Sequence, residues 1–225
     1  MHFLKNIFEN KTLFLTTVFV LIIFSSIISY PNISLDLYFN NLYINYAKSF
    51  ANLIKLNPIE EVNDITTFPI WGYGIIHWLF NSSKFSILIF QQGLNFITIY
   101  LIDKVLRKKD QKTLFIWRIL ILFGFPYFLF HTQIWPKSIS SSLLILAVLQ
   151  LLYYFDNRKK SHLIFSGLFF GLLCNFRSDY IYLILSMPIF LIFWEIIEKK
   201  KSTLFSLSIL ILPIITLIFL IPWGL

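Results

Sequence analysis

One acidic and two basic residues lie at the ends of long apolar runs, where charged side chains are uncommon. Asp36 follows the first apolar run, Lys137 follows Pro136 in IWPKS, and Arg177 follows another apolar run in NFRSDY. A carboxylate can accept a proton from a hydroxyl or an amine, and a cation can stabilise an anion. A charged side chain at the edge of an apolar environment costs free energy, so it usually has a function or an oppositely charged partner. These three residues are therefore the first candidates for chemistry.

Each candidate also has a purely structural interpretation. Asp36 could cap the helix that follows it, because Asp accepts hydrogen bonds from the free N–H groups of a first turn. Arg177 and Asp179 could form a local ion pair that closes a tight turn. Lys137 could extend its ammonium group toward water while its stem lies on apolar surface. The sequence alone leaves both interpretations open.

The composition indicates that lipid surrounds most of this chain. Of its 225 residues, 57% are hydrophobic and only 13% are charged, whereas a soluble domain is about 45–50% apolar. A net charge of +8 could suggest nucleic acid. The basic residues, however, form short clusters between apolar runs, which is typical of the loops of membrane proteins. We therefore expect membrane lipids and no nucleic acid among the partners.

Seven apolar runs approach the length of about 20 residues that a helix needs to cross a bilayer. The first could be a signal peptide, but no convincing cleavage site follows it, so we expect it to be an anchor. The sequence predicts an all-α polytopic protein, with residues 1–225 as a single membrane domain. The predicted spans are 12–30, 85–102, 114–131, 139–155, 162–176, 180–197 and 203–221.

The distribution of Lys and Arg predicts the orientation. With a cytoplasmic N-terminus, 14 of the 19 basic residues fall on the inner side, as the positive-inside rule requires. The remaining five, on the outer side, are Lys48, Lys55, Lys84, Lys137 and Arg177. We expect a multi-pass protein of the plasma (inner) membrane with its C-terminus outside.

This orientation makes residues 31–84 a long outer loop, and its sequence predicts two surface helices. Polar residues recur at helical spacing from Asn41 to Lys55 and apolar residues occupy the opposite face, which is typical of a helix lying flat on a membrane. The apolar segment 67–80, TFPIWGYGIIHWLF, is too short to span and predicts a re-entrant or interfacial helix. Elsewhere, Gly167 and Gly171 form a GxxxG pattern that predicts close helix packing.

Signatures of soluble enzymes are absent from the sequence. There is no glycine-rich phosphate loop, HExxH or GxSxG. His77 and His131 have no partner at metal-ligand spacing. The single cysteine, Cys174, excludes an intramolecular disulfide. We predict neither a metal site nor a cofactor.

The order of these features resembles the GT-C class of membrane glycosyltransferases, especially the branch with protein O-mannosyltransferases and lipid A aminoarabinose transferase. A first span leads to an acid and then to D-x6-Y-x3-A, present as Asp36, Tyr43 and Ala47. TFPIWGYGIIHWLF is similar to the Pro- and Tyr-containing segment before the second span. FQQGLNFITIYLIDKVLRK, IWPKSISSSLLILAVLQLLYYF and HLIFSGLFFGLLCNFRSDYIYLI resemble later spans.

The resemblance implies an inverting transferase with a lipid-linked sugar donor. By this resemblance, Asp36 would be the catalytic base. Arg177 and Lys137 would bind the phosphate of a polyprenyl-phosphate sugar. Tyr43, Trp71 and Tyr73 would line the pocket. The acceptor would be a lipid, a glycan or a protein at the outer face.

Two other functions remain compatible with the sequence. The chain could be a non-catalytic membrane subunit or lipid-binding relative that keeps the fold without the chemistry. A transporter or flippase is disfavoured, because it would place charged or polar pairs within its spans and the apolar runs show almost none.

Overall fold

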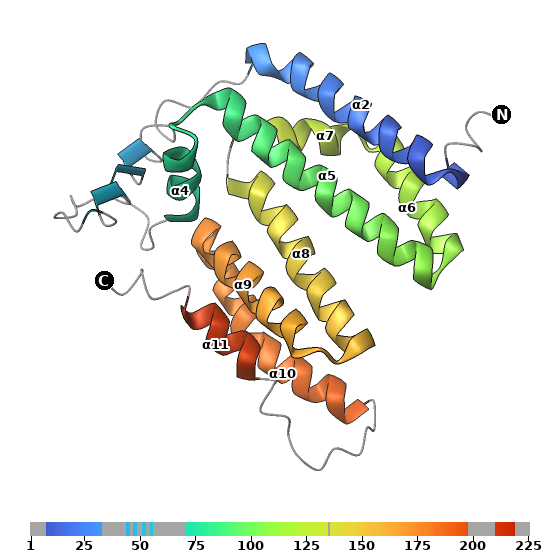
Figure 1. Ribbon diagram of the computed structural model, residues 1–225, viewed down its shortest axis with the longest axis vertical. Coiled ribbons are helices and arrows are strands. Elements are labelled where there is room, and N and C mark those ends of the chain that lie inside the picture. Colours follow the sequence, from blue (N-terminus) through green and yellow to red (C-terminus); the bar gives the residue numbers. More distant parts are fainter. Residues whose placement is uncertain are drawn as a thin grey trace. The chain divides into compact units, whose positions relative to one another are not determined.

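The computed structural model describes residues 8–32, 44–45, 47–48, 51–52, 55, 71–134, 136–197 and 210–218. All elements in these residues are helical (Figure 1), which confirms the all-α prediction. The long helices are α2 (Lys11–Ser29), α5 (Lys84–Lys109), α6 (Gln111–Phe123), α8 (Pro136–Asn157), α9 (Lys160–Phe176) and α10 (Ile181–Ile197). The short elements are η1 (Tyr30–Asn32), α4 (Trp71–Leu79), α7 (Phe125–Thr132), η2 (Ser178–Tyr180) and α11 (Ile211–Ile218).

Several of the helices are long and apolar enough to cross a membrane. Among the described residues, α2, α5 and α8 each satisfy this criterion, and the bent pair of α6 and α7 raises the number to four. α9 is a shorter apolar helix of 17 residues. The chain is therefore a membrane protein with multiple spans, and the count of seven spans remains a prediction.

The expected continuous span over 114–131 is wrong in one respect, because it is two helices. α6 ends at Phe123, α7 begins at Phe125, and their axes differ by 61°. Pro126 explains the break, since proline lacks the N–H that would continue the ladder and its ring clashes with the preceding turn. Gly124 supplies the corner between the two helices.

The chain forms two compact units. The first contains Met1–Asn40 and Ser82–Ile139, and the second contains Asn41–Asn81 and Ser140–Leu225. A single membrane domain over residues 1–225 remains a prediction.

In the first unit, α2 packs against α5, α6 and α7. Phe14, Val18 and Ile22 recur every four residues on α2 and are buried in a core with Ile99 and other apolar side chains. The opposite face of α2 keeps large apolar residues exposed, including Phe19, Phe24 and Ile27. Such a surface is stable next to acyl chains rather than water, which agrees with α2 as a span.

Polar side chains define the ends of these helices. Asn10 caps α2 by accepting hydrogen bonds from the N–H groups of Thr12 and Leu13 at 2.9 and 3.2 Å. Asp110 alone separates α5 from α6 and caps α6 through the N–H groups of Lys112 and Thr113. The hydroxyl of Thr113 also donates to Asp110 and, with the backbone donors, lowers the pKa of its carboxyl. The cap therefore fixes a sharp turn between α5 and α6.

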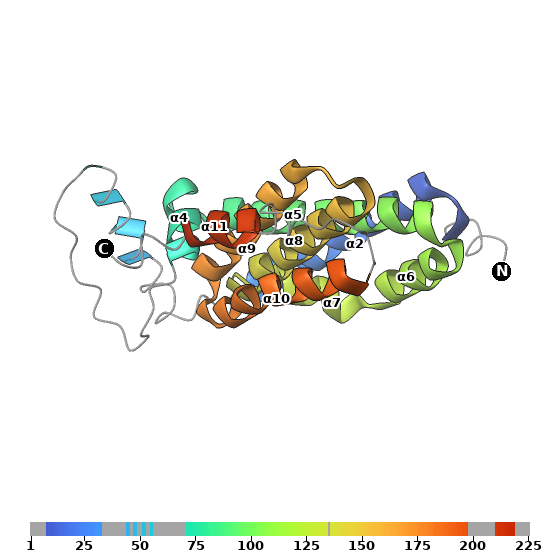
Figure 2. The ribbon, with the colours of Figure 1, turned by 90° about the horizontal axis from the view of Figure 1, so that it is seen from below.

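In the second unit, α11 lies along α9 in both views (Figure 1 and Figure 2). The two backbones approach closely at Gly167, where an added Cβ would lie 2.8 Å from the carbonyl oxygen of Leu212. The hydroxyl of Thr216 donates to the Gly167 carbonyl oxygen at 3.1 Å. The close packing predicted for the GxxxG pattern is confirmed at Gly167.

Candidate functional site

Helix α4 brings part of the apolar segment 67–80 against the end of α9. Its nine residues, Trp71–Leu79, extend about 13 Å at 1.5 Å per residue, so it is the short, non-spanning helix that the sequence predicts. Gly72 permits the contact. A Cβ on this residue would lie 2.6 Å from the ring of Phe176 and 3.0 Å from the backbone carbon of Asn175.

Tyr73 on α4 packs against α9. Its side chain is fully buried, and its ring packs edge-on against Phe176 at 6.2 Å between centroids. On the other side it packs against His77, one turn further along α4, at 5.1 Å. Burial lowers the pKa of His77 to about 4, so this imidazole is neutral at physiological pH. The expected pocket-lining residue Tyr73 is thus part of a packed aromatic cluster.

Arg177 follows Phe176 directly and closes the end of α9. Its backbone N–H donates to the Leu173 carbonyl oxygen, and its guanidinium donates from Nε to Asp179 at 3.0 Å and from Nη2 to the second carboxylate oxygen. The guanidinium also lies 5.6 Å from the centre of the Tyr180 ring. The local ion pair that the sequence analysis left open is therefore present. Nη1 takes no part in it.

Two of the expected site residues, Tyr73 and Arg177, lie at the same end of α9 in the second unit. Phe176 touches α4 through Gly72 and Tyr73 and is the chain neighbour of Arg177. Trp71 is the first residue of α4, although its side chain lies outside the described ones. The candidate site consists of the Arg177 cation, which suits an anionic group, and of the buried rings of Tyr73 and Phe176, here called the aromatic wall, which fix the end of α9.

Other expected residues are not placed in this site. Lys137 is exposed in the first turn of α8 and belongs to the first unit. Asp36 and Tyr43 lie outside the described residues. Part of the expected surface helix is seen, since residues 44–45, 47–48 and 51–52 are helical, with Ala47 buried and Lys48 exposed. The roles of Asp36, Tyr43 and Lys137 stay predictions.

Two polar features of the first unit were missed by the sequence analysis. On α5, Gln91, Gln92, Asn95 and Thr98 are all buried, and the hydroxyl of Tyr127 on α7 donates to Asn95 Oδ1 at 2.6 Å. Nearer the α5–α6 turn, Asp103 and Arg118 form a buried ion pair. The spacing of the four α5 residues at i, i+1, i+4 and i+7 was the signal available for the first feature.

Within the described part of the chain, no group of three His, Cys, Asp or Glu side chains could hold a metal ion.

A family model of the dolichyl-phosphate-mannose-protein mannosyltransferases matches residues 66–223, which is more than half of the chain. The chain belongs to this family. It is therefore a membrane glycosyltransferase of the GT-C type, as the resemblance implied. No curated protein and no solved structure matches it.

The family match runs from the segment containing α4 to beyond α11. It includes Trp71, Tyr73, Lys137 and Arg177 and begins after Asp36 and Tyr43. Family membership thus covers the aromatic wall and the cation of the second unit.

Proposed function

We propose that this chain transfers a sugar from a polyprenyl-phosphate donor to an acceptor at the outer face of the membrane. The family match over residues 66–223 is the observation that carries the proposal. The family's description names dolichyl phosphate, mannose and protein. Mannose and a protein acceptor are therefore the first substrates to test, with a lipid or glycan as the other acceptor classes.

The physical chemistry of such a donor agrees with the expected site. Its polyprenyl tail dissolves in the bilayer while its phosphate and sugar stay at the interface, so the reactive bond lies at interface depth. A base must therefore lie at the end of a span. Asp36 lies six residues after the end of the first predicted span, 12–30, and satisfies this requirement.

The reaction proposed is a single displacement with inversion. Asp36 removes the proton of the acceptor hydroxyl or amine, whose oxygen or nitrogen attacks the anomeric carbon. The bond from that carbon to the phosphate oxygen breaks, and polyprenyl phosphate leaves with the bonding electrons. Arg177 stabilises the negative charge that grows on the phosphate.

The packing of α4 on α9 supports the donor site at Arg177. The buried packing of Tyr73 on α4 against Phe176 on α9 fixes the end of α9 and therefore the residue that follows it, Arg177. Nη1 of Arg177 takes no part in the pair with Asp179, and we propose that it donates to a phosphate oxygen. We infer that donor phosphate and Asp179 share one guanidinium.

Transfer from a lipid-linked donor tests the proposal. Vesicles containing the purified chain would receive radiolabelled polyprenyl-phosphate mannose or, in a parallel sample, a nucleotide-linked mannose with an acceptor protein. We expect label in the acceptor only from the polyprenyl donor. Transfer from the nucleotide sugar alone would contradict it, and donor binding without transfer would favour a non-catalytic lipid-binding relative.

A further inference from the structure

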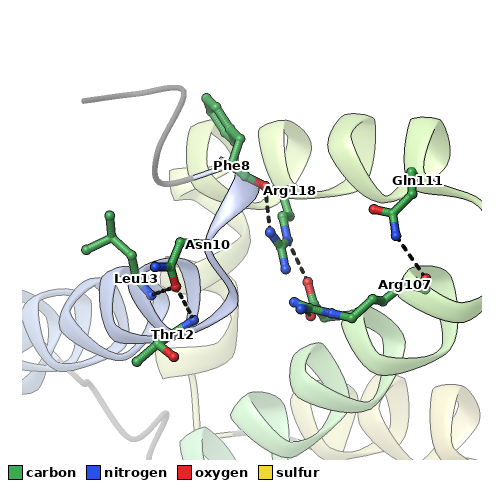
Figure 3. A network of polar contacts seen from close by, with 8 residues as sticks. Phe8, Asn10, Thr12, Leu13, Arg107, Gln111 and Arg118 are labelled. Carbon is green, nitrogen blue, oxygen red and sulfur yellow. Dashed lines mark hydrogen bonds and ion pairs between the residues drawn. The ribbon is translucent and has the colours of Figure 1, made fainter. Parts of the chain in front are cut away.

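A second polar site lies in the first unit, where the start of α2 meets the turn between α5 and α6 (Figure 3). A cavity of about 500 Å³ opens there. Its wall includes Phe8, Glu9, Arg107, Gln111, Phe115 and Arg118. None of these residues has a part in the sugar-transfer site.

A buried ionic network forms the floor of this cavity. Arg118 Nε lies 2.7 Å from Asp103 Oδ1, and Arg107 Nη2 lies 3.1 Å from Asp103 Oδ2. Arg118 also donates from Nη1 to the carbonyl oxygen of Phe8 at 2.5 Å (Figure 3). The side chains of Arg118 and Asp103 are 1% and 0% exposed. Two guanidinium groups thus share one carboxylate, which leaves the network with one net positive charge.

This network has donors that the described residues do not satisfy. Arg118 Nη2 and Arg107 Nε are buried and have no hydrogen-bond partner among those residues. A buried donor on a charged group without an acceptor costs more free energy than one on a neutral group. A phosphate oxygen is a strong acceptor for a guanidinium.

The surroundings of the cavity favour a lipid phosphate over a free one. Exposed Lys108, Lys109 and Lys112 lie in the helix turns beside it, and basic residues near a membrane surface attract anionic lipid. Phe8 and Phe115 pack edge-on at 5.4 Å and make part of the wall apolar. Glu9 is the one acid among the lining residues named above. A phospholipid matches both parts of the cavity, because its phosphate can contact the guanidinium groups of the floor and its acyl chains can contact the apolar part of the wall.

We propose that this cavity binds the phosphate of an anionic phospholipid, with Arg118 and Arg107 donating to its oxygens. In the predicted orientation the lipid belongs to the inner leaflet. The site would fix the start of α2 to the α5–α6 turn, because Phe8 and Arg118 both contribute to it. The proposal does not depend on sugar transfer.

Lipid-dependent thermal stability tests this site. The purified chain in detergent would receive short-chain phosphatidylglycerol, phosphatidylcholine or inorganic phosphate at equal concentration. We expect phosphatidylglycerol alone to raise the Tm. An equal rise with phosphatidylcholine would overturn the proposal, and an equal rise with inorganic phosphate would overturn the assignment to a lipid.

Two variants and a control locate the effect. Arg107→Gln should remove most of the rise, and Arg118→Lys should reduce it because a lysine keeps the charge opposite Asp103 but lacks the planar fork. Lys108→Gln, which removes the same charge from the adjacent exposed position, should keep most of it. An undiminished rise in Arg107→Gln would overturn the site.

Native mass spectrometry of the parent should show about a tenfold preference for phosphatidylglycerol over phosphatidylcholine, roughly the effect of one charge-assisted contact. The absence of a preference would overturn the proposal without any variant.

Discussion

A structural role and a phosphate-binding role of Arg177 predict opposite effects of its neighbour Asp179. If the guanidinium only closes the turn after α9, then Asp179 is its necessary partner, at 3.0 Å from Nε. If it holds a donor phosphate, then Asp179 is a competing anion that weakens phosphate binding. Removing the charge of one residue at a time separates the two roles.

Arg177→Gln should weaken binding of polyprenyl phosphate about 10- to 100-fold, since a hydrogen bond to a charged group contributes about 1.5–3 kcal/mol. Asp179→Asn, the matched control, should leave binding unchanged or stronger. Equilibrium binding of a fluorescent polyprenyl phosphate measures both. Parent-like affinity in Arg177→Gln would show that the residue only partners Asp179.

His77 makes the attachment of α4 sensitive to acid. Its pKa is about 4 in the folded chain, against 6.5 when exposed, so the unfolded segment binds more protons between these values. The contribution of neutral His77 to the stability of the folded segment is therefore fully present above about pH 6.5 and is lost as the pH falls toward 4. Hydrogen exchange over residues 71–80, corrected for its intrinsic pH dependence, should show protection falling across this window. A His77→Gln variant should lose that pH dependence, and an identical pH profile in parent and variant would contradict the role of His77.

At the scale of elements, the contact between α4 and α9 positions the site. α4 has only nine residues, which is too short for an isolated helix to be stable in water, so packing against α9 must hold it. Gly72, Tyr73 and Phe176 make that contact. Adding one methyl group at Gly72 should therefore disturb the site without touching a charged residue.

Gly72→Ala should destabilise the packing of α4 by about 1–3 kcal/mol, the usual cost of overfilling a packed contact. The Phe176 ring can rotate away, but the backbone of Asn175 cannot. Gly93→Ala is the control, because its new Cβ would meet nothing within 4 Å and alanine favours helix. Thermal unfolding and hydrogen exchange at 71–80 measure the difference. Equal stability of the two variants would contradict the close approach of α4 to α9.

Hydropathy predicted the helices well and their contacts poorly. The break at Gly124 was readable from Pro126, and the buried polar stripe from Gln91 to Thr98 was readable from its helical spacing. The pair of Asp103 and Arg118 was not, because their meeting depends on the tight turn at Asp110 and on burial by α2. The approach of α4 to the end of α9 links Gly72 and Tyr73 to Phe176, about a hundred residues further along the sequence, so no local pattern contains it. Trp71 and Tyr73 became pocket candidates through family resemblance alone.

At the scale of the whole molecule, the orientation of the chain decides which face can carry the chemistry. The inner placement of 14 of 19 basic residues predicts that 31–84 lies outside and that the α5–α6 turn lies inside. This orientation predicts an outer-face donor site at Arg177 and an inner-leaflet lipid in the phospholipid cavity.

Cysteine accessibility tests the orientation. In a Cys174→Ala background, which removes the one native thiol, Asn57→Cys should react with a membrane-impermeant maleimide in intact cells. Lys108→Cys should react only after the membrane is opened. Labelling of position 108 and not of position 57 in intact cells would reverse the topology.

The central claim is that Asp36 is the base of a lipid-linked sugar transfer, and one substitution tests it most directly. Asn caps helices about as well as Asp but cannot accept the acceptor's proton, and loss of general base catalysis costs roughly 10²–10⁴ in rate. We expect Asp36→Asn to fold, insert and bind polyprenyl-phosphate mannose like the parent while its rate of mannose transfer falls by that factor. Transfer by Asp36→Asn at the parent rate would contradict the claim and leave Asp36 as a helix cap.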